Sequence, residues 1–575
     1  MSQATVRRAR HPKGLYVLFM TEMWERFAYY LLAGILLLYF LDNKTGGKGF
    51  TEAKAADITG TFLALIWLPM FIGGMIADRY FGYIRSVFIG GAFLAAGYFG
   101  LIIPGDTAMY ISLGLIVIGN GFFKPNISTL LGNIYNREEL KPLKDNAYNI
   151  FYMGINTGSL LCNFVAAILR NTFSKGEVWH AGSLRIAITG WGFAFAAAGI
   201  GMLIGLVNLA TRVRHVREGD VRKPLQKEDM TLGEISLYVF VPAIGAAILG
   251  YFLPGKLWNT SLFGSPSTDA FIFACVPILG FFVSIWVRAK GEDKKGVGAL
   301  LFIFAISVVF WSLYYQNFTG YTLWAERHTD RSITTHWVEK GANWLQLLQT
   351  ANTSPRKVDS MNAYMAPVRD RSGHIIRVMG PDLYFRNLPR DQWPPPGQGL
   401  KLANTELYQS IGPFFIVTLT PILVGLLTWL RKRNREPTTP SKFGIALFLS
   451  GVSSLVMVFA VMSVASIYQY KVSSGWLWGT YFVITAAEIF LSPMGLSLVS
   501  KLAPARLTSL LMGGWFLTMS IGSKVAGMMT SSWDKFPDKR IYFLIWFVAG
   551  VLGSALIFSR IKWLNRIVRE KTGEK

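Results

Sequence analysis

Fourteen mainly apolar stretches, each about 20 residues long, limit what this chain can fold into more than any other feature of its sequence. A helix of that length crosses the hydrocarbon core of a bilayer. Backbone amides find no water there, so the stretches must be helices despite their many β-branched and aromatic residues. We therefore predict an all-α polytopic membrane protein. The stretches cover approximately 15–40, 54–77, 85–103, 108–132, 148–169, 189–210, 234–253, 269–288, 298–321, 407–430, 443–468, 478–500, 509–531 and 543–562.

The composition excludes a water-soluble protein, since 52% of the residues are apolar and 16% are charged, against about 25% charged in soluble domains. The formal net charge of +24 would suit a nucleic-acid partner, but the cations lie mainly between the apolar stretches, so we expect none. Cys162 and Cys275 are too far apart for a disulfide framework or a site with paired cysteines. We expect no metal, no cofactor and no enzyme activity.

Lysine and arginine gather in alternate connections between the stretches, and this sets the orientation in the membrane. They are dense in the N-terminal tail, in 211–233, 289–296 and 431–442, and in the C-terminal tail. Because cytoplasmic loops carry the excess of cations, both termini should be cytoplasmic. The first stretch is too long for a signal peptide and should remain as a span. We expect a multi-pass protein of the cytoplasmic (inner) membrane, in contact with the lipid bilayer.

The basic connection 211–233 is the natural joint between two halves. We predict a six-helix bundle in 1–212, a basic cytoplasmic linker with two additional transmembrane helices in 213–296, and a second six-helix bundle in 297–575. No close repeat relates the halves in sequence, so their symmetry is an expectation from architecture alone. A site between two bundles of one chain needs no second subunit, and we expect a monomer.

One non-cytoplasmic segment, about 326–404, is too long for a simple loop. Residues 336–350 look amphipathic and helical, and 364–369 and 374–379 are typical of two short strands around the turn 371–373. The segment could form an external cap that gates, docks a partner or is merely tolerated. An enzyme or receptor whose active part is this segment is a further alternative, although the segment has no metal-ligand spacing, nucleophile motif or glycine-rich phosphate loop.

Ionisable side chains inside membrane spans usually mark a pathway or a site. Glu22, Glu25, Arg26 and Tyr29 follow at helical spacing and share one face of the first stretch. Arg26 cannot fully neutralise both carboxylates, so one of them should take up and release a proton near the working pH. The alternative is a static ion-pair cluster that fixes the packing.

Lys124 in the fourth stretch and Glu488 in the twelfth are two further intramembrane charges, each near a proline that interrupts the helix. A cation in the first half and an anion in the second would suit a ligand with a carboxylate and a separated amine. The alternative is a permanent structural bridge between these two side chains.

Amide and aromatic side chains in the same stretches suit a pocket that accepts varied side chains. After the second stretch, glycines and charged residues form a short connection whose role we expect to be conformational rather than ligand binding. The pocket candidates are Asn156, Trp311, Tyr315 and Gln316, and the hinge candidates are Gly74, Asp78 and Arg79.

Four motifs make the sequence resemble the proton-dependent oligopeptide transporter family of the major facilitator superfamily. The match extends over nearly all of the spans. The stretch 488–493 and the later 502–504 resemble the family's second-half signature, and the two additional helices resemble those of its bacterial members. The four motifs are Glu22-x-x-Glu25-Arg26-Phe27-x-Tyr29-Tyr30, Gly74-x-x-Ala77-Asp78-Arg79, residues 121–126 (GFFKPN) and residues 151–159 (FYMGINTGS).

This resemblance implies a major facilitator fold of two six-helix bundles plus two additional transmembrane helices. It implies a symporter that imports di- and tripeptides by alternating access, with protons as the coupling ion and no other cofactor. By matched position, Arg26 and Lys124 would meet the peptide carboxylate and Glu488 its amino group. Protons would be coupled by Glu22, Glu25, Arg26 and Glu488, and the other substrate-binding residues would be Tyr29, Tyr30, Trp67, Asn156, Trp311, Tyr315, Gln316 and Ser492.

Three positions depart from the family's pattern. Ala33 stands where members carry a second arginine, Tyr315 where they carry a glutamate, and Trp67 where they carry a tyrosine. The arginine and the glutamate can pair as an external gate in the family, and the loss of both at once strands no charge. We therefore expect an altered external gate, which leaves room for a different peptide preference. The alternative is a proton-coupled transporter of another small solute, drug-like or a nitrogenous metabolite.

Overall fold

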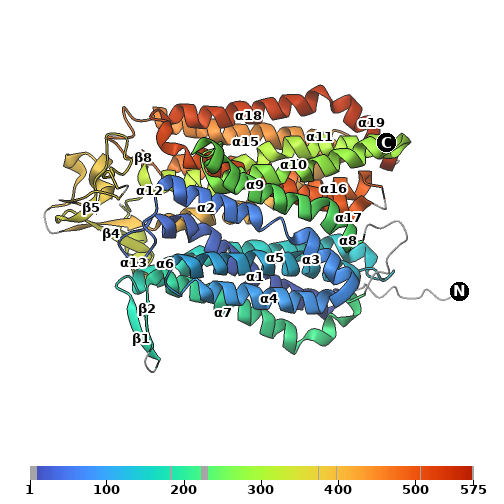
Figure 1. The fold of residues 1–575 in the computed structure, drawn as a ribbon, viewed down its shortest axis with the longest axis horizontal. Helices are drawn as coiled ribbons and strands as arrows, with labels where there is room; N and C mark the ends of the chain where they lie inside the picture. The colour runs from blue at the N-terminus through green and yellow to red at the C-terminus, as the bar shows by residue number, and fades with distance from the viewer. Residues whose placement is uncertain are drawn as a thin grey trace.

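The computed structural model describes residues 10–572 except 182–183, 222–230, 334, 373, 396–397 and 505–506. Within this part, long helices run side by side between two ends of the molecule (Figure 1). Eleven helical segments of the described residues are long and apolar enough to cross a membrane, and the predicted all-α membrane fold is confirmed. Their main helices are α1 (Lys13–Leu41), α5 (Asp106–Ile134), α6 (Lys144–Thr172), α7 (Gly190–Thr211), α9 (Val241–Trp258), α10 (Pro266–Arg288), α11 (Gly291–Tyr314), α14 (Ile411–Lys432), α15 (Thr439–Met462), α16 (Gly475–Leu502) and α18 (Lys539–Ser559).

The other three predicted spans are helical as well. The span predicted at 54–77 consists of α2 (Glu52–Leu65), a turn and α3 (Met70–Ile76), because Pro69 lacks an N–H and disfavours helix in the residue before it. The π-helical turn η1 (Ala77–Phe81) then leads through Gly82, whose φ is 77°, into the next span. That span is α4 (Tyr83–Gly100), and the last of the three is α17 (Thr508–Ser531).

Two groups of helices form the body of the molecule. In the first group α1 packs on α6 and α7, and α4 packs on α5. In the second group α15 packs on α16 and α18, and α11 packs on α17. The groups meet where α2 packs along α17. A Cβ on Gly60 of α2 would lie 2.6 Å from the Cα of Gly527 in α17, so the close approach requires glycine.

The two additional helices, α9 and α10, pack on each other beside both groups. A buried polar cluster attaches α10, since Asp57 of α2 accepts hydrogen bonds from Ser267 at 2.5 Å and Thr268 at 3.0 Å and pairs with Lys524 of α17 at 2.7 Å. The domain boundaries at 212 and 296 stay a prediction. Part of their basic joint, 222–230, lies outside the described residues, as do Arg7, Arg8 and Lys575 of the tails.

A cap, residues 328–404, covers one end of the helices, while α8 (Leu232–Ile235) and α19 (Ile561–Thr572) lie at the opposite end (Figure 1). The cap follows α12 (Gly320–Arg327) and contains the short helix α13 (His336–Trp344). Its small apolar core consists of Ala351, Tyr384, Phe385, Leu388 and Leu402. Its strands are β3 (Thr329–Asp330), parallel to β8 (Val472–Ser473); β4 (Leu348–Asn352), antiparallel to β7 (Gly399–Ala403); and β5 (Arg356–Asp359), antiparallel to β6 (Arg377–Gly380).

Two predictions for this segment are wrong in detail. The helix predicted for 336–350 ends at Trp344, and residues from Leu348 onward form strand β4. The predicted pairing of 364–369 with 374–379 is reduced to a single bridge between Arg369 and Ile375. Asn362 explains this, because its side chain accepts the backbone N–H groups of residues 364 and 366 and thereby forms a turn.

A hairpin of β1 (Glu177–Ala181) and β2 (Leu184–Ile188) lies between α6 and α7 and was not predicted. The two strands pair antiparallel, Glu177 opposite Ile188. Figure 1 places the hairpin at the same end of the molecule as the cap.

The glycine contact between α2 and α17 gives a first test. Gly60→Ala should lower the free energy of unfolding in detergent by about 1–3 kcal/mol, because the new methyl group meets backbone rather than a movable side chain. Gly114→Ala in α5 is the matched control, since nothing lies within 4 Å of its Cβ position. Equal stability of the two variants would contradict the close packing.

Candidate functional site

A cavity of about 240 Å³ lies between the two groups of helices. The first group contributes side chains from α1, α5 and α6, and the second from α11, α14, α16 and α17. Ten of the residues singled out from the sequence line this cavity, which brings them together but does not test their roles. These ten are Arg26, Tyr29, Tyr30, Trp67, Lys124, Asn156, Trp311, Tyr315, Glu488 and Ser492.

Gln316 is the exception among the predicted binding residues, because it is buried and does not line the cavity. Its side-chain oxygen accepts a hydrogen bond of 2.7 Å from the hydroxyl of Tyr542 in α18. α11 ends at Tyr314, and Gln316 lies in the 3-10 turn η6 (Tyr315–Phe318) that follows.

A network of charges lies on the α1 side of the cavity. Arg26 donates to the Glu25 carboxylate from Nε and from Nη2, at 2.5 Å each, and its Nε lies 3.7 Å from Glu22. Arg26 also donates from Nη2 to the Asn120 side chain at 3.0 Å, and its guanidinium lies 4.7 Å from the centre of the Tyr29 ring. All of these side chains except Tyr29 and Arg26 lie behind the cavity wall.

Lys124 completes the network by forming an ion pair with Glu22. The alternative that Lys124 forms a permanent bridge with Glu488 is therefore wrong. The reason is proximity: α1 and α5 belong to the same group and pack together, while Glu488 lies on α16 in the other group. Each carboxylate of the network faces a cation, which offsets the cost of burying the charge.

Glu488 faces the cavity from α16, on the wall formed by the second group. Its carboxylate has the Tyr314 side chain as a hydrogen-bond partner and makes no ion pair with any other residue that the structure describes. The cavity thus has cations on one wall, Arg26 and Lys124, and a carboxylate on the opposite wall. A ligand with separated opposite charges would satisfy both walls.

Aromatic rings form most of the remaining wall. Tyr30 of α1 stacks on Phe318 across the two groups with ring centres 6.4 Å apart, and Trp67 stacks on Phe516 at 6.1 Å. The buried indole N–H of Trp311 has no hydrogen-bond partner within the described part of the chain. A ligand carbonyl could accept from this indole, because a buried donor without a partner is costly.

Three amide side chains at the cap end of the cavity were not found from the sequence: Asn163, Asn317 and Gln409. Gln409 donates to the Thr322 hydroxyl at 2.5 Å and to the carbonyl of Asn317, and Asn163 donates to the Ser410 hydroxyl at 3.2 Å. Asn163 carried a usable signal, since it follows Asn156 by seven residues and therefore shares its helix face.

The predicted hinge lies outside the cavity. Gly74 packs against Pro125 of α5, with 3.6 Å from its Cβ position to the Pro125 Cβ. Asp78 accepts a hydrogen bond from the Tyr83 hydroxyl, and Arg79 follows in the π-helical turn η1. The conformational role of Gly74, Asp78 and Arg79 stays a prediction.

At the cap end, buried ion pairs join the two groups. Arg170 of α6 pairs with Glu406 at 2.7 Å, and Glu52 of α2 pairs with Arg327 of α12 at 2.5 Å. Ala33 and Tyr315 are both buried and uncharged, so these two positions contribute no ion pair between the groups.

The Lys124 ion pair gives the second test. Lys124→Ala should cost about 3–5 kcal/mol of unfolding free energy in detergent, because Glu22 is left as a buried charge with a single, longer ion pair. The double variant Lys124→Ala with Glu22→Gln should recover much of that loss. Additive losses in the double-mutant cycle would contradict the pairing.

Comparison with known proteins identifies relatives over nearly the whole chain. A model of the POT family matches residues 84–352 and 401–546. "Uncharacterized transporter YclF" of Bacillus subtilis (strain 168) is 29% identical over 554 residues, 95% of this chain and 93% of its own. A di-/tripeptide transporter of Lactococcus lactis subsp. lactis (strain IL1403) is 28% identical over 558 residues, 95% of this chain and 94% of its own.

Solved structures of similar proteins share the fold. A crystal structure of the peptide transporter POT in complex with sulfate is 28% identical and superposes with a TM-score of 0.69. The alignment covers 97% of this chain and 96% of that one. The fold is therefore shared with a protein described as a peptide transporter.

Proposed function

The chain belongs to the POT family, and on this premise we propose that it is a proton-coupled symporter that imports di- and tripeptides by alternating access. It is similar to transporters of di- and tripeptides over nearly their full length, which supports peptides as the substrate. The observation that carries the proposal is the cavity with Arg26 and Lys124 on one wall and Glu488 on the other.

A short peptide matches this charge arrangement. Its carboxylate would pair with Lys124 and Arg26, its amino group with Glu488, and its backbone carbonyl would accept from a donor such as the Trp311 indole. Each residue adds about 3.3–3.6 Å to an extended peptide, so a dipeptide separates its carboxylate from its amino group further than a free amino acid does. The aromatic rings between the charges accept varied side chains.

Proton coupling follows from competition for Lys124. In the structure the Lys124 ammonium pairs with Glu22, and an arriving peptide carboxylate would take its place. Glu22 would keep only its longer pair with Arg26, at 3.7 Å. A buried carboxylate that has lost its nearer cation is more costly to keep ionised, so Glu22 would bind a proton. Peptide and proton then bind cooperatively, and the coupling is reciprocal because binding free energies are linked.

We place the protein in the cytoplasmic (inner) membrane with both termini in the cytoplasm. The cation-rich connections support this orientation. The cavity is lined by residues of a single chain, which supports a monomer as the working unit.

The role of Glu488 can be tested with a blocked peptide. Liposomes with wild-type protein should take up labelled dialanine, and dipeptides but not free alanine should compete. N-acetylation of dialanine should weaken its competition about 10- to 100-fold, since a charge-assisted hydrogen bond contributes about 1.5–3 kcal/mol. In Glu488→Gln, competition by dialanine should be weakened by the same factor, and N-acetylation of dialanine should weaken it no further. Equal competition by both peptides in the wild type would contradict the assignment.

The role of Glu22 can be tested by separating accumulation from exchange. Glu22→Gln should abolish accumulation of dialanine driven by an inward proton gradient, because the side chain can no longer gain or lose the coupled proton. The rate at which internal dialanine exchanges for external dialanine should stay within about tenfold of the wild-type rate. A tenfold change corresponds to about 1.4 kcal/mol in the free-energy barrier. Glu292→Gln at the exposed start of α11 is the matched control. Undiminished accumulation by Glu22→Gln would contradict the coupling role.

A further inference from the structure

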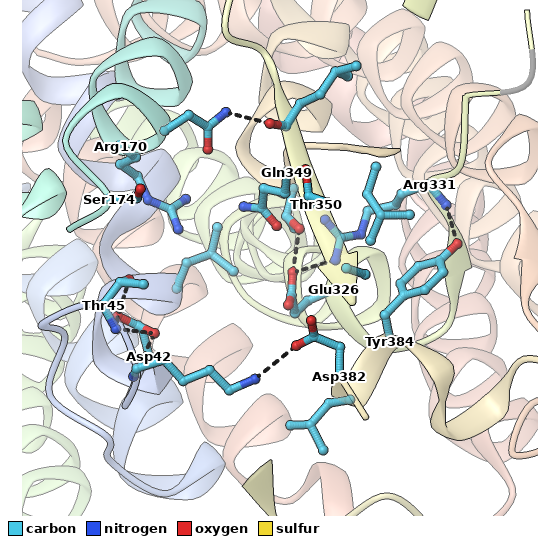
Figure 2. Close-up of a pocket in the computed structure, with 18 of the residues that line it drawn as sticks. Asp42, Thr45, Arg170, Ser174, Glu326, Arg331, Gln349, Thr350, Asp382 and Tyr384 are labelled. Atoms are coloured by element: carbon cyan, nitrogen blue, oxygen red, sulfur yellow. Dashed lines mark hydrogen bonds and ion pairs between the residues drawn. The ribbon is translucent and has the colours of Figure 1, made fainter. Parts of the chain in front are cut away.

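A second and larger cavity, about 600 Å³ in volume, lies between the cap and the helix ends beneath it. We call this cavity the vestibule. Figure 2 shows Asp42 and Arg170 on one side of it and Glu326, Arg331 and Asp382 on the other. Neither the sequence motifs nor the peptide cavity accounts for so large a polar space.

Cations outnumber acids in the lining of the vestibule, with six Lys or Arg side chains and four Asp or Glu side chains. Two of the four acids accept hydrogen bonds from neutral side chains. Asp42 accepts from the Trp191 indole at 2.8 Å, and Asp359 accepts twice from Asn43, at 2.7 and 2.6 Å. The six cations are Lys44, Arg170, Arg327, Arg331, Arg356 and Lys401.

Three of the six cations already have an acid: Arg170 pairs with Glu406, Arg327 with Glu52 and Arg331 with Glu326. The other three, Lys44, Arg356 and Lys401, have a single acid between them among the described residues. Asp382 is shared by Lys44, at 3.4 Å, and Arg356. Burial, and next the charge of the nearby Arg356, hold the pKa of Lys44 below its usual value. The ammonium group of Lys401 donates a hydrogen bond of 3.1 Å to the Thr350 hydroxyl. An anion in the vestibule would therefore be stabilised by several cations at once.

Arg331 provides a second, independent indication. Its side chain is only 3% exposed and is held by Glu326 at 3.2 Å and by the carbonyl of Ala403 at 2.9 Å. Its Nε is buried and has no hydrogen-bond partner within the described residues. Since buried guanidinium donors are normally paired, this atom lacks an acceptor that a ligand oxygen would supply.

The vestibule and the peptide cavity lie in series along the same helices. On α1, Tyr30 lines the cavity and Leu38 the vestibule; on α6, Asn163 lines the cavity and Arg170 the vestibule. Seven or eight helical residues correspond to about 10–12 Å along the axis. The Arg170–Glu406 ion pair lies at the boundary between the two cavities. A solute in the vestibule is therefore about 10–12 Å from the transport site along the helix axis.

We propose that the vestibule is a second peptide site, which captures short peptides by their carboxylates before they enter the inner cavity and favours peptides with net negative charge. This proposal rests on peptide import as the function of the chain. The cap supplies Arg356, Asp382 and Lys401 to the site, which gives the insertion a role in substrate selection rather than in enzyme activity.

The test compares two double variants of the full-length protein in liposomes, using uptake of Ala-Asp, dialanine and Ala-Lys. K44Q/K401Q removes two vestibule cations, and K340Q/K357Q removes two exposed cap cations that do not line it. We expect K44Q/K401Q to raise the KM for Ala-Asp about threefold or more relative to Ala-Lys, with little change in kcat, because such charges act mainly on capture. K340Q/K357Q should leave the ratio unchanged.

Equilibrium binding separates the two sites. In detergent, the double variant K124A/E22Q, which keeps its fold because no buried charge is left unpaired, should retain weak, saturable binding of Ala-Asp that the added K44Q/K401Q substitutions remove. Equal KM ratios in K44Q/K401Q and K340Q/K357Q, or displacement of Ala-Asp from K124A/E22Q by sulfate as effectively as by Ala-Asp itself at matched ionic strength, would overturn the vestibule site. Failure of the wild type to transport any peptide would instead refute the proposed function, so the two failures are distinguishable.

Discussion

The cost of placing a charge in a membrane interior is the constraint on which the rest of this structure depends. An ionised side chain there must find a counter-charge or give up its charge. On one wall of the cavity the protein meets this constraint fully, since Glu25 pairs with Arg26 and Glu22 with Lys124. On the opposite wall Glu488 makes no ion pair with the described residues, so a cationic group of a ligand would complete the site.

In the proposed mechanism this asymmetry would link substrate to protons. The peptide amine would pair with Glu488 while the peptide carboxylate took the place of Glu22 at Lys124. The cavity would then favour ligands with separated charges, and the displaced Glu22 would bind a proton. The Arg170–Glu406 ion pair joins the two groups at the cap end, and it would have to break for access from that end.

The sequence was sufficient for the helices, because apolar length is a local property. For the cavity walls it was sufficient only in part: helical spacing and the family resemblance singled out ten residues that line the cavity, but Gln316 lies behind the wall and three amide side chains of the wall were missed. It was not sufficient for the partner of Lys124, which depends on which helices are neighbours in space. The strand pairing of the cap was wrong for a different, local reason, since the turn formed by the Asn362 side chain overrides the alternation of apolar and polar residues. The vestibule could not be predicted, because Asp42, Arg170 and Asp382 meet only through the tertiary fold.

The most direct measurement is proton entry that accompanies peptide entry. Liposomes containing the purified protein and an internal pH-sensitive dye would receive dialanine outside, with no proton gradient imposed and the membrane potential clamped. The account predicts that dialanine acidifies the interior and that free alanine does not. Entry of labelled dialanine at the same rate with no change in internal pH would contradict coupling through the buried charge network.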